Sequence, residues 1–405
     1  MAAGLILSRS TFQTNNTVES VRRYTRSIEF DYVNWTIQSL FIKNKSISLG
    51  LNRYLSDEEG REIVNAYFQQ VDEINALHSE ISAIYADPEI TDPSKMAEDA
   101  NRRLAKMEDE NEQLAALCET VLQQQVSTVV AEMGLSVGGQ LIPPLLYHVT
   151  PLPMALIVSP RDTIRQDADI SLLADLSLEE IVDLEQRIEQ EMDVSALVVN
   201  IGGVGIYPTM VLRSTDLSWM IETIAHEWVH NFLTLRPMGM LYESTPEMRT
   251  MNETTANLAG KEIALRVYER FYPQFVPQET TGYEENLTEE TAEPPEFDYR
   301  AEMHETRVTV DQLLQDGKIG EAEQYMETRR LFFREHGYQI RRINQAYFAF
   351  YGAYADEPGG QAGEDPVGPA VRKLRQQSDS LAKFLNRISW MTSFDNLQKE
   401  ISGGQ

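Results

Sequence analysis

Two histidines four residues apart are the side chains of this chain with the clearest chemical potential. They occur in the segment His226-Glu227-Trp228-Val229-His230. Residues four apart lie on one face of an α-helix, so both imidazoles would point the same way and bind one Zn²⁺ at about 2.0–2.1 Å. Glu227, beside the first histidine, is then placed to act as a general base on a water molecule at the metal.

The residues around this motif favour a buried helix, predicted over residues 217–235. Its apolar positions recur at helical spacing: Ile221, Ile224, Ala225, Trp228, Val229 and Phe232. The alternative without a metal is a pair of ordinary surface histidines that happen to share a helix face. The continuous apolar face and the intact Glu227 favour a metal site.

A catalytic zinc ion needs a third protein ligand and one open position. The pattern H-E-x-x-H-x-x-G-x-x-H, which supplies a third histidine, fails because Leu233 and Arg236 occupy the required positions. Glu253 is the predicted third ligand, since a second helix over residues 246–271 can return across the first after a short loop. Glu243 and Glu247 are the alternatives.

The second helix also carries residues suited to support the metal. Asn257, one turn after Glu253, is predicted to accept a hydrogen bond from a zinc-bound imidazole. Ala256 and Gly260 are small, as a close helix crossing requires. Glu222, one turn before His226, is either a supporting partner or an exposed acid.

These motifs resemble those of the gluzincin metallopeptidases, in which a glutamate on a second helix completes the zinc site. The string Asn252-Glu253-x-x-Ala256-x-x-x-Gly260 is most similar to a group of bacterial predicted aminopeptidases. The resemblance is confined mainly to the two motif helices. It implies one Zn²⁺ ion and a peptide or protein substrate. Many gluzincins have Asp where this chain has Asn257, so the water at the metal would be tuned differently.

Hydrolysis also needs a donor for the developing oxyanion and a surface for the substrate. Tyr351, in the aromatic run 347–354, is the predicted donor. The alternatives are Tyr347 and Tyr354 of the same run, or His304 with Arg307. Residues 207–212 are predicted to form an edge strand, because Pro208 would be poorly tolerated in a central one. An extended peptide adding to that strand would make Tyr207 and Thr209 substrate-binding residues.

The predicted fold is α+β and mostly helical. Residues 1–134 should contain a long antiparallel hairpin of helices over 56–85 and 94–133, although a dimerising coiled coil is an alternative. A zincin-like catalytic core with a small mixed sheet is expected over 135–275, with strands at 155–158, 196–199 and 207–212. An acidic flexible loop over 276–298 and a C-terminal helical region over 299–405, packed on the core, complete the chain.

Composition excludes some partners. The 405 residues carry a net charge of −28, which argues against nucleic acid and against direct binding to anionic membranes. The single cysteine, Cys118, is expected in the core. No membrane span or signal peptide is visible, so the chain as given is predicted to be soluble. Two locations stay open: the cytoplasm, and a bacterial envelope that the protein would reach through a missing N-terminal anchor. The sequence predicts no oligomeric state.

Two other functions compete with a zinc peptidase. One is a non-catalytic binding or scaffold protein stabilised by zinc; however, structural zinc sites usually have four protein ligands, commonly including cysteine. The other is a zinc hydrolase acting on a different amide or ester. The sequence does not distinguish an endopeptidase from an aminopeptidase.

Overall fold

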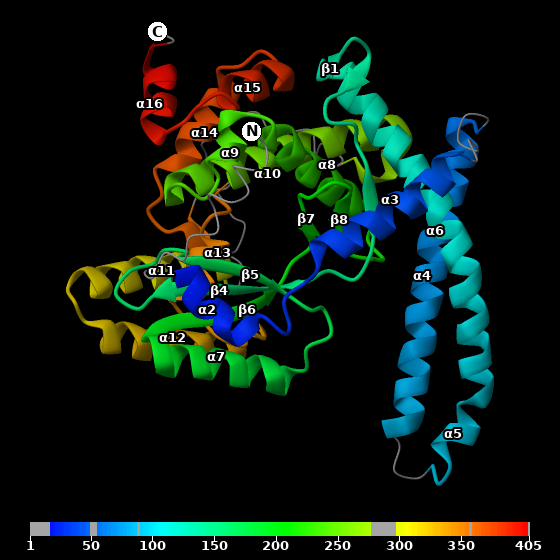
Figure 1. Cartoon of the computed structure of the whole chain (residues 1–405), viewed down its shortest axis with the longest axis horizontal. Helices are drawn as coiled ribbons and strands as arrows, with labels where there is room; N and C mark the ends of the chain where they lie inside the picture. Colours follow the sequence, from blue (N-terminus) through cyan, green and yellow to red (C-terminus); the bar gives the residue numbers. More distant parts are fainter. Residues whose placement is uncertain (1–16, 49–54, 87–89, 277–296, 356–358, 404–405) are drawn as a thin grey trace, which may run out of the picture. The chain divides into compact units, whose positions relative to one another are not determined.

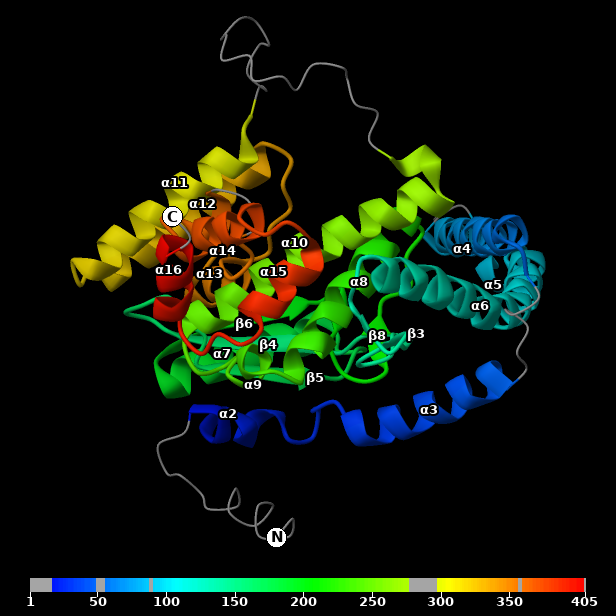
Figure 2. The ribbon, with the colours of Figure 1, turned by 90° about the horizontal axis from the view of Figure 1, so that it is seen from above.

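The computed structural model describes residues 17–48, 55–86, 90–276, 297–355 and 359–403 (Figures 1 and 2). The chain forms two compact units, each assembled from three segments. The first unit comprises 1–30, 153–201 and 293–365; the second comprises 31–152, 202–292 and 366–405. These units therefore do not follow the contiguous ranges expected from the sequence. Most of the predicted acidic loop, residues 277–296, lies outside the described residues.

The first unit is built on an antiparallel three-stranded sheet of order β5-β4-β6. The strands are β4 (Met154–Pro160), β5 (Ala168–Leu172) and β6 (Val194–Asn200). Successive side chains of the central strand point to opposite faces. Ala155 and Ile157 enter one hydrophobic core, whereas Leu156 and Val158 enter another. The strand is apolar throughout because both of its faces are covered.

Helices cover the two faces of this sheet. Helix α7 (Leu178–Met192) and helix α2 (Thr17–Thr25) contribute to one core. The other core is formed with α11 (Tyr299–Gln315), α12 (Ile319–Glu335) and α13 (Gln345–Tyr351). A short 3₁₀ turn, η3 (Gly360–Ala362), follows. The capping box of Ser177 and Glu180 fixes the start of α7.

The second unit contains the predicted helical hairpin. Helices α4 (Asp57–Ala86) and α6 (Glu98–Glu132) lie side by side in both views and are joined through α5 (Pro93–Met96) (Figures 1 and 2). Their direction is antiparallel, because Asn111 donates to Gln70 at 3.3 Å while Arg103 lies 3.9 Å from Glu80. Cys118 is buried, as predicted. A buried ion pair between Lys43 and Glu119 links α3 (Tyr32–Ser48) to α6.

The second unit also holds a small mixed sheet of order β3-β8-β7. Its strands are β3 (Tyr147–Val149), β7 (Gly203–Val204) and β8 (Thr209–Val211). The predicted strands at 155–158 and 196–199 are not part of it, because they belong to the antiparallel sheet of the first unit. Strand β8 is central: it runs parallel to β3 and antiparallel to β7. The prediction of an edge strand over 207–212 is therefore wrong. Pro208 precedes the first paired residue, so its missing N–H falls outside the ladder. A separate hairpin joins β1 (Ser136–Val137) and β2 (Gln140–Leu141).

The remaining helices of the second unit pack around one long helix. Helices α8 (Leu217–Thr234) and α10 (Pro246–Phe271) contact each other, with the short α9 (Pro237–Met240) between them in sequence; η2 (Pro273–Phe275) follows α10. Helices α14 (Val367–Gln376), α15 (Leu381–Ile388) and α16 (Phe394–Gly403) pack on α10. The mostly helical α+β class is thus confirmed. None of the described helices combines the length and apolarity needed to cross a membrane.

Candidate metal centre

The apolar face of α8 fixes the orientation of its histidines. All of its predicted core residues are buried: Ile221, Ile224, Ala225, Trp228, Val229 and Phe232. Asp216 caps the helix by accepting a hydrogen bond from the Trp219 backbone N–H. Because the buried face locks the rotation of α8, the rings of His226 and His230 meet edge to face, with centroids 4.6 Å apart.

A close crossing brings α10 to these histidines. A Cβ atom added to Gly260 would lie 3.0 Å from the His226 backbone nitrogen and 3.1 Å from its Cα. Any larger residue would push the two helices apart. Ala256 is fully buried one turn earlier. The predicted need for small residues at this crossing is therefore confirmed.

Three potential ligand atoms converge at the crossing. The Nε2 atoms of His226 and His230 are 2.9 Å apart, and Oε2 of Glu253 lies 3.7 Å and 3.5 Å from them. Tetrahedral zinc with bonds of about 2.0–2.1 Å places its ligand atoms about 3.3 Å apart. These spacings suit one small cation. Glu243 and Glu247, the alternative ligands, are exposed.

The carboxylate of Glu253 has one satisfied and one unsatisfied oxygen. The Tyr242 hydroxyl donates a hydrogen bond to Oε1. Oε2 is buried and has no hydrogen-bond partner; its nearest charged neighbours are the two imidazoles. A buried acceptor left unpaired is costly. A cation between Oε2 and the imidazole nitrogens would satisfy it, so the donor set fits a metal ion.

The charges at the site favour a cation. Burial alone would raise the pKa of Glu253, but His230, His226 and Arg249 outweigh it and bring that pKa below its ordinary value. Burial would likewise lower the pKa of His230, yet the carboxylates of Glu253 and Glu227 raise it to about 9. The site therefore holds a proton at neutral pH that an incoming metal ion must displace.

Metal affinity should therefore depend on pH. For protein stripped with a chelator, we expect zinc affinity to fall about tenfold for each pH unit below 9, because His230 must lose its proton to become a ligand. Calorimetric titration in buffers of different ionisation enthalpy would report the released proton. His78→Gln, which changes a half-exposed histidine on the hairpin, should behave as wild type. An affinity independent of pH between 7 and 9 would contradict this assignment.

Glu227 lies beside the potential ligands, on the side of strand β7. Its side chain is 7% exposed. A Cβ atom added to Gly203 would lie 2.4 Å from Oε1 of Glu227, and one added to Gly205 would lie 3.3 Å from Oε2. Because neither glycine has a side chain, the Glu227 carboxylate can lie close to the backbone at these two positions. Burial, with the charge of Glu253 adding and that of His230 opposing, raises the pKa of Glu227 to about 7.

Two asparagines for which the sequence predicted no role support the site. Asn252 Oδ1 accepts a hydrogen bond from Nδ1 of His230 at 2.8 Å, which directs Nε2 toward the ligand cluster. Asn231 follows the second histidine and donates to Ile206 O at 3.1 Å and to Thr209 Oγ1 at 2.8 Å. It anchors α8 to the loop that borders Glu227. The supporting role predicted for Asn257 stays a prediction.

The other predicted site residues belong to the first unit or make contacts of their own. Tyr351 belongs to the first unit, where its ring packs 4.6 Å from that of Tyr347. Its role as an oxyanion donor stays a prediction. Thr209 is only 3% exposed and accepts the hydrogen bond from Asn231, whereas Tyr207 is 38% exposed. Glu222 accepts a hydrogen bond from the Tyr268 hydroxyl at 3.3 Å.

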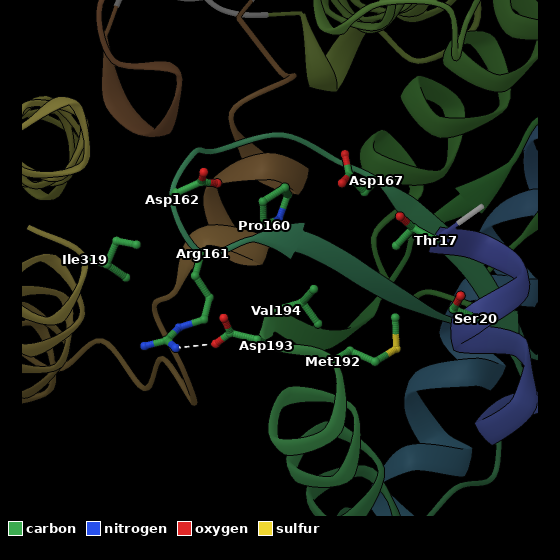
Figure 3. Close-up of a pocket in the computed structure, with 10 residues that line it drawn as sticks. All are labelled: Thr17, Ser20, Pro160, Arg161, Asp162, Asp167, Met192, Asp193, Val194 and Ile319. Carbon is green, nitrogen blue, oxygen red and sulfur yellow. Dashed lines mark hydrogen bonds and ion pairs between the residues drawn. The ribbon is translucent and has the colours of Figure 1, made fainter. Parts of the chain in front are cut away.

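A concave region lies in the first unit (Figure 3). It has a volume of about 540 Å³ and is lined by residues from α2, the ends of β4 and β6, and the start of α12. Arg161 is paired with Asp193 at 2.6 Å, while Asp162 and Asp167 point from separate positions on its rim (Figure 3). Within the described part of the chain, the metal-ligand group found is the one at His226, His230 and Glu253.

Comparison with known proteins adds no assignment. No protein-family model matches the chain, and no curated protein or solved structure is significantly similar to it. The interpretation of the site therefore depends on its own geometry.

Proposed function

We propose that the protein is a zinc-dependent hydrolase that cleaves peptide bonds. His226, His230 and Glu253 would hold the ion, and Glu227 would act as the general base. The observation that carries this proposal is the convergence of three ligand atoms at one point, with an unpaired carboxylate oxygen among them. A structural role for the ion would not require Glu227, whose buried carboxylate lies on the same helix between the two histidines.

The protein's own groups supply the proton transfers. When bound, Zn²⁺ would polarise a substrate carbonyl and lower the pKa of a water molecule. Glu227 would accept the proton of the attacking water and then donate it to the leaving amine. A pKa of about 7 suits both steps, because the carboxyl can gain and lose the proton near neutral pH. Asn252 would keep His230 in the tautomer that binds through Nε2.

Strand β7 offers a place for an extended peptide. Among the described residues, its one strand partner is β8, whereas β8 is paired on both sides. Gly203 lies in this strand and borders Glu227. A peptide added to β7 by main-chain hydrogen bonds would pass beside the general base with little demand on its sequence. The substrate surface proposed here is therefore β7, in place of the 207–212 strand.

A peptide-library digestion tests this function. Zinc-loaded wild type is incubated with a mixture of peptides of known sequence, and the products are identified by mass spectrometry. We expect zinc-dependent cleavage that disappears in Glu227→Gln; cleavage at the first residue or inside the chain would separate aminopeptidase from endopeptidase. A parallel panel of esters and non-peptide amides is included. Turnover of that panel without peptide cleavage would overturn the peptidase assignment.

Gly203→Ala should impair the reaction without removing the metal. Its new Cβ would stand 2.4 Å from Oε1 of Glu227, so the carboxylate must shift. Displacing a catalytic group by this amount should lower kcat/KM by about 10- to 100-fold. Gly320→Ala is the matched control, because a Cβ there meets no atom within 4 Å. Full activity in Gly203→Ala would show that Glu227 does not need the close approach of its carboxylate to residue 203.

A further inference from the structure

Tyr242 and Arg249 form a hydrogen-bonded chain that ends on the third ligand. Tyr242 follows α9, in the loop that joins the two motif helices, and Arg249 lies near the start of α10. The Tyr242 hydroxyl donates to Oε1 of Glu253, and Arg249 Nε donates to the Tyr242 oxygen at 3.3 Å. The Tyr242 ring also meets His230 edge to face, with centroids 6.3 Å apart.

The direction of the hydrogen bonds in this chain is fixed. A guanidinium has only donors, so the Tyr242 oxygen must be the acceptor of its bond with Arg249. The single hydroxyl proton of Tyr242 is then committed to Glu253. Arg249 is buried, which holds its guanidinium against the hydroxyl. Oε1 of Glu253 is thus occupied by a donor, while Oε2 faces the imidazoles without a hydrogen bond.

We infer that Tyr242, held by Arg249, is a positioning residue that makes Glu253 bind the metal through one oxygen only. This inference rests on the proposed function. Without the Tyr242 hydroxyl, the carboxylate can rotate and offer both oxygens. A two-oxygen ligand would then crowd the open position that a catalytic zinc site keeps for water or substrate, and with water bound the ion would have five ligand atoms instead of four. Tyr242 therefore protects that position.

Tyr242→Phe tests the inference in the full-length protein, because it removes one oxygen and keeps the ring beside His230. Co²⁺ replaces zinc as a probe, since its visible absorption weakens when the coordination number rises above four. We expect a weaker Co²⁺ band than in wild type, a change in zinc affinity of about 10- to 100-fold, and a loss in kcat with little change in KM. Tyr272→Phe is the control; its hydroxyl bonds to Gln125 within the same unit.

The outcomes separate this inference from the proposed function. A Co²⁺ spectrum and zinc affinity identical to wild type in Tyr242→Phe would overturn the inference and leave the metal site standing. A wild type that takes up neither Co²⁺ nor Zn²⁺ would overturn both. If Tyr242→Phe does not fold, Arg249→Met is the second test, because it removes the guanidinium that donates to the Tyr242 oxygen and holds the hydroxyl in place. It should weaken the Co²⁺ band in the same direction, and an unchanged band would overturn the inference.

Discussion

Glu227→Gln is expected to lower kcat/KM for peptide hydrolysis by about 10²- to 10⁴-fold, the usual contribution of a general base. The amide is isosteric with the carboxylate, so the packing against Gly203 is retained. It cannot accept a proton from water at neutral pH. The three ligand atoms belong to other residues, so the variant should bind zinc as wild type does. Activity measured beside zinc content separates these two effects.

A matched control for this variant lies on α10. Glu247→Gln makes the same chemical change at an exposed position near the start of the helix. It should leave both zinc content and activity unchanged. Retention of at least wild-type activity by Glu227→Gln would refute the general-base assignment. Loss of zinc from the same variant would instead make Glu227 part of the ligand set.

Glu253→Ala should have the largest effect on metal binding. Glu253 is 4% exposed and supplies the one potential ligand group that carries a full negative charge. Changes in residues that only support a ligand typically cost 10- to 100-fold in affinity, so removal of the ligand itself should cost more than about 100-fold. Competition titration with a chromophoric chelator would measure this loss.

The alternative ligands provide the comparison for Glu253→Ala. Glu243→Ala and Glu247→Ala remove exposed carboxylates from the same stretch of chain and should keep wild-type affinity. If one of them lost zinc while Glu253→Ala retained it, the third ligand would be that residue. The crossing of α8 and α10 at Gly260 would then have to rearrange on metal binding.

The first motif helix was predicted well because its apolar residues recur at helical spacing, and both motif helices begin at capping residues in the structure. Asp216 caps α8, and Thr245 followed by Pro246 starts α10. The three potential ligand residues were predicted from helical spacing and from the short loop that lets the second helix return across the first. Each of these signals lies within a few residues of the feature that it predicts.

The division into units could not be predicted in this way. Strand β4 was visible as an apolar run, but its sheet neighbours and its covering helices are set by long-range packing. Helix α13 lies against β4 although it follows nearly two hundred residues later in the chain. Apolar periodicity indicates that a face is buried without indicating what buries it. The same limit explains why residues 207–212 were wrongly predicted to form an edge strand, because the residue composition of a strand does not determine its position in the sheet.

The supporting residues of the site were missed for a geometric reason. Asn252, the residue before Glu253, makes the hydrogen bond to His230, while the role of Asn257, one turn after Glu253, stays a prediction. The choice depends on how α10 is rotated at the crossing. Tyr242 lies in a loop without periodicity, so no pattern pointed to its contact with Glu253.

The proposed function requires that His226, His230 and Glu253 hold a metal ion beside a catalytic Glu227. Elemental analysis of purified wild type, Glu227→Gln and Glu253→Ala, each supplemented with zinc and then dialysed, tests it most directly. We predict about one equivalent of zinc in wild type and in Glu227→Gln, and a loss of zinc in Glu253→Ala. Wild-type protein without zinc would contradict the account, and the two histidines would then be neighbours on a helix without a metal.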